Sequence, residues 1–258
     1  MKDYLMMGLD LFGWVVVASC AVMVGISKTG LPGMGILFVP LMAMVMPAKQ
    51  STGMVLGILV MGDVFAASYY HRSAMWRHII RLIPATLVGI VTGYFAMKVI
   101  SDEQLKPIIG VIVVAMLAVN WWRNSRGEDV PTEWWFAEVM GFFAGLTTMM
   151  ANAAGPVMIV YLLAMRLPKV EFVGTSAWFF FIVNWLKVPF SIHLGLVNVE
   201  SIKLGFIMLP FIILGLVLGI VALKKMPQKV FEITIQVLAL AAGIKLLVPA
   251  NWIAKLWF

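Results

Sequence analysis

Apolar runs, separated by short polar stretches, follow one another along almost the whole chain. Several of these runs approach the roughly 20 residues that a helix needs to cross the hydrocarbon core of a bilayer. Only 12% of the 258 residues are charged, whereas an average soluble domain has roughly 25%. Because the polar stretches are all short, no sizeable soluble domain fits between the runs. The sequence therefore predicts an all-α, polytopic membrane protein.

Polar interruptions divide the chain into ten apolar segments, five on each side of the most polar stretch, "RNSRGEDVPTE". The segments are 9–27, 35–47, 52–70, 79–98 and 105–122 in the first half and 134–149, 155–166, 172–192, 199–222 and 229–248 in the second. We predict a first transmembrane repeat over residues 1–122, a polar linker loop over 123–133 and a second transmembrane repeat over 134–258.

Glycines, prolines and one polar residue recur in the same order in both halves, which indicates an internal repeat. At offsets of 120 to 126, the matched pairs are Gly25 and Gly145, Gly35 and Gly155, Pro47 and Pro168, Gly53 and Gly174, Asp63 and Asn184, Pro84 and Pro210, Gly89 and Gly215, and Gly93 and Gly219. The change of offset implies about five extra residues near 195–203 in the second half.

The second segment of each half has about 12 residues and would cover only ~18 Å of a ~30 Å hydrocarbon core. It forms either a re-entrant hairpin with the preceding segment or a tilted crossing. Either way the pair adds zero or two crossings, so each half crosses an odd number of times. The predicted fold is two inverted repeats, each with a short broken-helix or re-entrant pair plus three longer transmembrane helices. A pair that crossed only once would make the repeats parallel instead.

The net charge is +7, but the basic residues are scattered singly and form no basic face for a nucleic acid. Ten Lys and Arg residues, every arginine included, fall in one set of loops and six fall in the other. The first set is Arg72, Arg77, Arg81, Arg123, Arg126, Arg166, Lys169, Lys224, Lys225 and Lys229, and the second is Lys2, Lys49, Lys98, Lys106, Lys203 and Lys255. The excess of positive charge predicts that the first set is cytoplasmic and that both termini lie outside.

Helix-breaking residues interrupt two apolar regions at matching places, in "SKTGLPGMG" at 27–35 and "TTMMANAAGP" at 147–156. Non-helical backbone cannot face lipid, because each unpaired N–H or C=O costs several kcal/mol there. It is tolerated where it lines a cavity, and paired interruptions in two halves point to the binding site of a transporter. We therefore expect the substrate between these two stretches.

The chemistry of the two stretches suits an anion. Interrupted helices present backbone N–H groups and positive dipole ends, and a lysine adds a full charge. The candidate substrate-binding residues here are Ser27, Lys28, Thr29, Thr147, Thr148, Asn152 and Gly155. The alternatives are that Lys28 reaches out to interfacial water and that the hydroxyls bond only to their own helices.

Two further spans carry polar residues. Asp63 lies in "LVMGDVFAA", and its repeat mate Asn184 lies in "FIVNWLKVP" three residues before Lys187. A charged carboxyl in lipid is costly, so Asp63 is protonated, paired or open to water. Coupling of transport to protons is one hypothesis for Asp63, and a structural ion pair with Lys28 or Lys187 is the other. Asn184 and Lys187 share a helical face and join the candidate binding residues.

No other pattern indicates a cofactor, a metal or an enzyme. His71, His78 and His193 are too far apart in sequence to suggest a metal site, and the single cysteine, Cys20, excludes an internal disulfide. No nucleotide-binding loop of the G-x-x-x-x-G-K-[ST] form occurs.

The stretch "GISKTGLPGMGILFVPLMA", followed by the Pro47 to Gly53 spacing and a diverged second copy, resembles the sulfite exporter TauE/SafE family over nearly the whole chain. The resemblance implies a bacterial inner-membrane permease that moves sulfite, sulfonates or related sulfur compounds. The glycine-rich segment of the family maps onto Gly30, Gly33 and Gly35. In the second half only Gly155 of "ANAAGP" matches.

Together these observations predict export of a small sulfur-containing oxyanion by alternating access, with the lipid bilayer and the anion as partners. An interior-negative potential favours this direction by about 2.3 kcal/mol per charge per 100 mV. An importer, or a transporter of another solute, is the alternative; a membrane enzyme or assembly factor is a weaker one. The oligomeric state does not follow from the sequence.

Overall fold

The structure is a computed structural model that describes residues 9–32, 38–42, 45–46, 48–99, 114, 118 and 134–247. Every element of regular structure in these residues is a helix. The first half contains α1 (Leu11–Thr29), α2 (Phe38–Met42), α3 (Ala48–Tyr69) and α4 (Trp76–Ala96). The second contains α6 (Trp134–Ala151), α7 (Ala154–Ala164), α8 (Lys169–His193), α9 (Val199–Ile207), α10 (Leu209–Lys225) and α11 (Gln228–Leu247). Apart from residues 114 and 118, the predicted segment 105–122 and the linker 123–133 lie outside the described residues.

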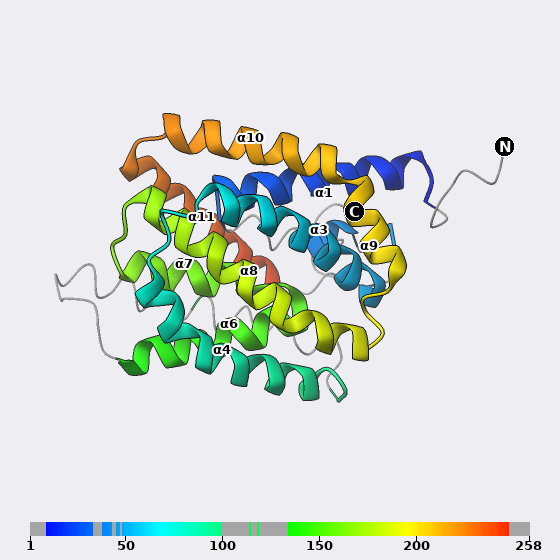
Figure 1. The fold of residues 1–258 in the computed structure, drawn as a ribbon, viewed down its shortest axis with the longest axis horizontal. Coiled ribbons are helices and arrows are strands. Elements are labelled where there is room, and N and C mark those ends of the chain that lie inside the picture. The colour runs from blue at the N-terminus through cyan, green and yellow to red at the C-terminus, as the bar shows by residue number, and fades with distance from the viewer. Residues whose placement is uncertain are drawn as a thin grey trace.

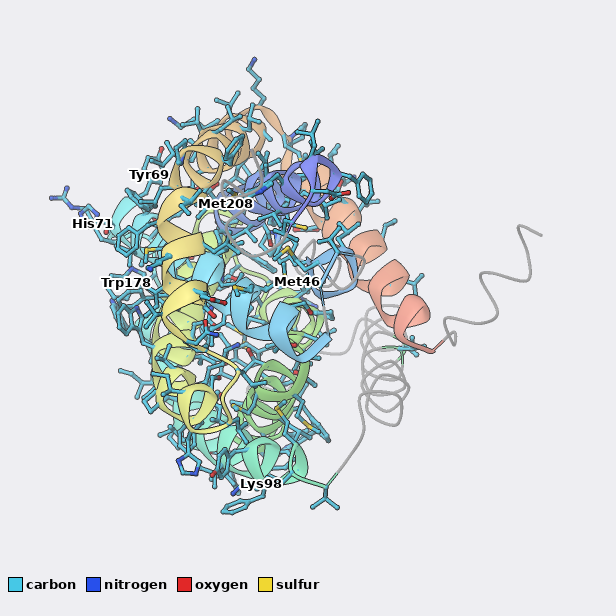
Figure 2. The ribbon with its side chains drawn as sticks, turned by 90° about the vertical axis from the view of Figure 1, so that its right-hand side faces the viewer. Met46, Tyr69, His71, Lys98, Trp178 and Met208 are labelled. Carbon is cyan, nitrogen blue, oxygen red and sulfur yellow. The ribbon has the colours of Figure 1, made fainter. Side chains whose placement is uncertain are left out.

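Within the described residues, three helical stretches are long and apolar enough to cross a membrane, namely Leu11–Thr29, Ser51–Tyr69 and Trp76–Ala96. The bent pair of α9 and α10 adds a fourth if it counts as one span. Exposed side chains on these helices are largely apolar, as on α4, where Ile80 and Val88 face outward and fit contact with lipid. The expectation of a multi-pass membrane protein is thereby confirmed. Figure 2 shows the side chains of Tyr69, His71 and Lys98 at the periphery of the molecule.

The predicted segment 199–222 differs from the structure, which divides it into two helices that meet at Met208 with a bend of 56°. Pro210 lies in the first turn of α10, a position that a proline tolerates because the N–H it lacks would have no partner within that helix. The additional residues expected near 195–203 form a turn, with Gly195 at a φ of 69°, followed by the first turn of α9.

Helices α1 and α10 pack side by side along one edge of the molecule (Figure 1). Their backbones touch, because a methyl group on Gly25 would come within 2.3 Å of the Ile212 carbonyl oxygen. A methyl group on Gly215 would likewise come within 2.0 Å of the Val22 carbonyl oxygen. Such approach is open only to glycine, as in the close helix contacts of other membrane proteins.

Helices α4 and α6 form a second pair of this kind along the opposite edge (Figure 1). A methyl group on Gly89 would come within 2.1 Å of the Phe142 carbonyl oxygen, and one on Gly145 within 2.1 Å of the Thr86 carbonyl oxygen. The four glycines of the two pairs are repeat mates: Gly25 matches Gly145, and Gly89 matches Gly215.

The two halves therefore exchange partners, because the first helix of each half packs against the corresponding later helix of the other. Between the two edges, α3 and α8, which are also repeat mates, contact one another directly. This exchange is compatible with a two-fold relation between the halves. The inverted direction of the repeats across a membrane stays a prediction.

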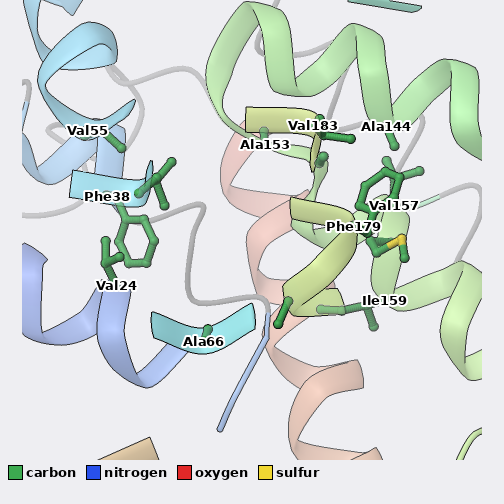
Figure 3. Packing of buried hydrophobic residues seen from close by; sticks show 14 of the residues in the cluster. Val24, Phe38, Val55, Ala66, Ala144, Ala153, Val157, Ile159, Phe179 and Val183 are labelled. Atoms are coloured by element: carbon green, nitrogen blue, oxygen red, sulfur yellow. The ribbon is translucent and has the colours of Figure 1, made fainter. Parts of the chain in front are cut away.

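One large apolar cluster fills the interior around these helices. It includes Val24, Phe38 and Val55 from the first half and Ala153 and Phe179 from the second (Figure 3). The buried polar residues described below are embedded in this cluster, so each of them needs a partner inside the protein.

Candidate functional site

Both predicted interruptions are places where helices end. Helix α1 ends at Thr29, and the Ile26 carbonyl oxygen accepts from the backbone nitrogens of both Gly30 and Leu31, at 2.8 and 3.1 Å. Helix α6 ends at Ala151, and α7 begins three residues later. Between them Asn152 has a φ of 52°, a left-handed conformation that asparagine tolerates better than most residues.

A cavity of about 40 Å³ lies where the two helix ends meet. It has room for about three water molecules, since one needs roughly 10–15 Å³ measured in this way. Its lining combines residues from both interruptions and from α2, α3, α7 and α8: Ser27, Lys28, Pro32, Phe38, Leu59, Thr148, Asn152, Gly155, Ser176, Ala177, Phe180 and Asn184. The structure thus brings the two interrupted stretches to one site.

Lys28 and Asp63 form a buried ion pair beside this cavity. The Lys28 Nζ atom lies 2.5 Å from Asp63 Oδ1, and the two side chains are 6% and 0% exposed. The ammonium group also lies 4.6 Å from the centre of the Phe180 ring, a cation–π geometry. Lys28 therefore does not extend into interfacial water, and the ion pair named as an alternative role for Asp63 is present.

Asn184 joins α8 to the same carboxylate. Its Nδ2 atom donates to Asp63 Oδ2 at 2.6 Å, and both residues are buried. Because a carboxylate can only accept, the amide nitrogen and not the amide oxygen must face it. Among the residues that the structure describes, Asn184 Oδ1 has no hydrogen-bond partner.

Lys187, which follows Asn184 by about one turn of α8, donates hydrogen bonds to residues at the C-terminal end of α6. Its Nζ atom donates to the carbonyl oxygen and to Oγ1 of Thr148, at 3.2 and 3.0 Å, and to Asn152 Oδ1 at 2.5 Å. Three acceptors match the three donors of an ammonium group. Asn152 Nδ2 in turn donates to the Thr52 carbonyl oxygen of α3 at 3.1 Å. Lys187 does not line the cavity but positions two residues that do.

The remaining candidate residues lie apart from the cavity. Thr29 Oγ1 donates to the carbonyl oxygens of Gly25 and Leu216, at 3.1 and 2.8 Å, and so ties α1 to α10. Thr147 Oγ1 donates to the Phe143 carbonyl oxygen of its own helix at 2.7 Å.

Gly30 packs against Gly219, whose carbonyl oxygen would lie 2.5 Å from a methyl group on Gly30. Gly33 and Gly35 lie outside the described residues. The structure therefore brings Ser27, Lys28, Thr148, Asn152, Gly155 and Asn184 together. It leaves Thr29 and Gly30 at the contact with α10, and Thr147 bonded to its own helix.

The sequence analysis missed Ser176 and Phe180, which line the cavity. They precede Asn184 by eight and four residues and so share its helical face. That spacing could have identified them once Asn184 was taken as part of the site. Among the described residues there is no group of three or more His, Cys, Asp or Glu that could hold a metal ion.

Apolar spans, two helix ends and a small cavity between them are typical of a polytopic membrane protein of the transporter class. The chain belongs to the sulfite exporter TauE/SafE family, whose family model matches residues 17–246. No curated protein and no solved structure gives a significant match to the chain. The family resemblance seen in the sequence is thereby confirmed.

Proposed function

We propose that the protein exports a small sulfur-containing oxyanion, such as sulfite, across the bacterial inner membrane by alternating access, with the cavity as its binding site. The observation that carries this proposal is the charge around the cavity. Lys28 and Asp63 neutralise one another. Lys187 donates only to neutral oxygens, so in the described part of the chain its charge has no carboxylate within ion-pair distance. A bound monovalent anion would balance it.

The neutral groups of the cavity also favour an anion. Ser27 and Ser176 line it with hydroxyl groups that can donate. Gly155 lies in the first turn of α7, whose N-cap, Ala153, provides no side-chain hydrogen bond. The first-turn N–H groups of a helix lack intrahelical partners and carry the positive end of its dipole. Backbone donors, hydroxyls and a lysine therefore converge on one small space.

The packing supports alternating access. The pairs α1–α10 and α4–α6 are each locked by glycine contacts, so each pair can move as one body. The cavity lies between these pairs, beside the central helices α3 and α8. Relative rocking of the two edges would expose the cavity to one side of the membrane and then to the other, as inverted repeats allow.

Asp63 is the candidate for proton coupling. A buried carboxylate that loses its counter-ion gains a proton more readily. We infer that Asp63 takes up a proton only in a step of transport in which it separates from Lys28, and that it is ionised while the ion pair is formed.

The test is anion efflux from proteoliposomes. Lys28→Gln should abolish sulfite efflux, and the neutral double variant Lys28→Gln/Asp63→Asn should stay inactive while recovering thermal stability, because it buries no unpaired charge. Thr92→Ala, which alters an exposed hydroxyl on α4, is the matched control. Undiminished efflux by the double variant would refute the role of the ion pair. Reversing the imposed voltage and proton gradients would separate export from import.

A further inference from the structure

The amide oxygen of Asn184 is a buried acceptor that the described protein leaves unpaired. Asn184 lines the cavity and is 1% exposed. Its Oδ1 atom has no hydrogen-bond partner in the described residues. A buried acceptor without a hydrogen bond costs free energy. A ligand that donates a hydrogen bond to this oxygen would therefore be favoured.

A rotation of the Asn184 amide group by 180° cannot supply its oxygen with a hydrogen-bond donor. A flip would place Oδ1 against Asp63 Oδ2, in a contact of 2.6 Å that now holds a hydrogen bond. Because Asp63 is ion-paired with Lys28, its oxygens only accept. The orientation of Asn184 is therefore fixed by Asp63, and its amide oxygen needs a donor that the described protein does not supply.

The charged groups around the cavity come from three helices: Lys28 from α1, Asp63 from α3 and Lys187 from α8. Helices α6 and α7 and the turn between them add Thr148, Asn152 and Gly155 to the lining, none of which titrates. In this arrangement of the described residues, the positive charge of Lys187 is not balanced by a carboxylate, and the Asn184 Oδ1 acceptor has no donor. The space of about 40 Å³ limits the ligand to a few heavy atoms.

We infer that the cavity selects a small, monovalent oxyanion in its hydrogen form, one that carries a hydroxyl group as well as its charge. This inference rests on the proposed function and specifies its substrate. The hydroxyl of the ligand donates to Asn184 Oδ1, and its charged oxygens accept from Lys28 and from the hydroxyls of Ser27 and Ser176. For sulfite the ligand is hydrogen sulfite with its proton on oxygen, not the dianion. Sulfate and simple sulfonates offer no such donor.

The test compares three anions by calorimetry on the full chain in lipid nanodiscs. Hydrogen sulfite should bind at least about tenfold more tightly than methanesulfonate, which has the same charge and no hydroxyl, since one hydrogen bond contributes about that much. Sulfate should bind more weakly still. Above the pKa of hydrogen sulfite, apparent affinity for sulfite should fall more steeply with pH than that for methanesulfonate, because only sulfite loses a proton of its own in this range.

Asn184→Ala should bring hydrogen sulfite down to the affinity of methanesulfonate, because it removes the acceptor. Ser176→Ala removes a donor and should weaken both anions equally, keeping the preference. Binding of methanesulfonate by each variant shows that it is folded. Equal affinities in the wild type, tightest binding of sulfate, or the same pH slope for both anions would overturn the inference. Failure of all three anions to bind would overturn the proposed function as well.

Discussion

Asp63 and Asn184 lie 121 residues apart, at the same position of the two halves, and are hydrogen-bonded to one another at 2.6 Å. Residues that meet their own repeat mate lie at the axis relating two halves. The same exchange is seen in the glycine contacts of α1 with α10 and of α4 with α6. This contact fits the predicted repeat, in which matching positions of the two halves meet at its centre, and here a carboxylate from one half faces an amide from the other.

Exchanging this pair tests how far the two positions are equivalent. Asp63→Asn leaves Lys28 without its counter-ion, and Asn184→Asp sets two carboxylates against each other, so each single variant should lose thermal stability. The double variant Asp63→Asn/Asn184→Asp moves the carboxylate to α8. There it stays near Lys28, whose ammonium group lies over Phe180, one turn from residue 184. The double variant should be more stable than the sum of the single losses by about 0.5–3 kcal/mol, a usual coupling for residues in contact.

Melting temperatures of the four proteins in detergent would measure this coupling. Additive losses would contradict the expected equivalence of the two positions. The neutral exchange Ser68→Ala, at an exposed hydroxyl on α3, should leave the melting temperature unchanged.

A larger side chain at the glycine contacts between α1 and α10, or between α4 and α6, should push the two helices of the pair apart. Gly215→Val would force side-chain atoms into the Val22 carbonyl oxygen, which a single methyl group already approaches to 2.0 Å. Overpacking costs about 1–3 kcal/mol or more when backbone must move, so the melting temperature should fall. Gly89→Val should have the same effect at the opposite edge.

Gly13→Ala is the matched control for these variants, since a methyl group there meets the Leu9 side chain at 3.1 Å instead of backbone. If Gly215→Val and Gly89→Val melted like Gly13→Ala, the crossings would not be close-packed.

The outline of the fold could be predicted from the sequence because lipid imposes it: apolar runs, helix breakers and repeated glycines map directly onto helices, ends and crossings. Pro84 and Pro210 show where such reasoning fails. They are repeat mates, yet Pro84 lies inside the continuous α4 whereas Pro210 starts α10 after a bend. Helix α9 ends one residue before the bend at Met208, whereas the corresponding part of α4 continues through Pro84, and no local signal distinguishes the two prolines.

Most of the polar residues that line the cavity were predicted from the sequence, but the contacts that each of them makes were not. Thr29 and Thr148 look alike in sequence, at the ends of corresponding helices. Thr29 bonds to a carbonyl of α10, whereas Thr148 accepts from Lys187 beside the cavity. Which neighbour each hydroxyl meets depends on contacts between helices distant in sequence. Ser176 was missed because it follows no helix breaker.

Lys187 should contribute both to stability and to anion affinity. Lys187→Met keeps the apolar stem but leaves acceptors on Thr148 and Asn152 unpaired, at about 1–3 kcal/mol for a buried group. It also removes the charge that we propose balances the anion, so the KM for sulfite efflux should rise. Lys98→Met, at an exposed lysine, is the control. A loss of stability without a change in KM would restrict Lys187 to a structural role.

Phe180 should set the size of substrate that the cavity accepts. Its ring lines a space of about 40 Å³ and lies 4.6 Å from the Lys28 ammonium group. Phe180→Ala removes one wall and a cation–π contact of about 0.5–2 kcal/mol. Efflux of sulfite should therefore weaken by about tenfold, given 1.4 kcal/mol per factor of ten, while efflux of the larger 2-hydroxyethanesulfonate should rise relative to it.

Competition between sulfite and 2-hydroxyethanesulfonate in proteoliposomes measures the ratio of their efflux rates. Phe181→Ala, at the neighbouring position outside the cavity lining, should leave the ratio unchanged, and a ratio that is the same in both variants would show that the Phe180 ring does not limit the substrate.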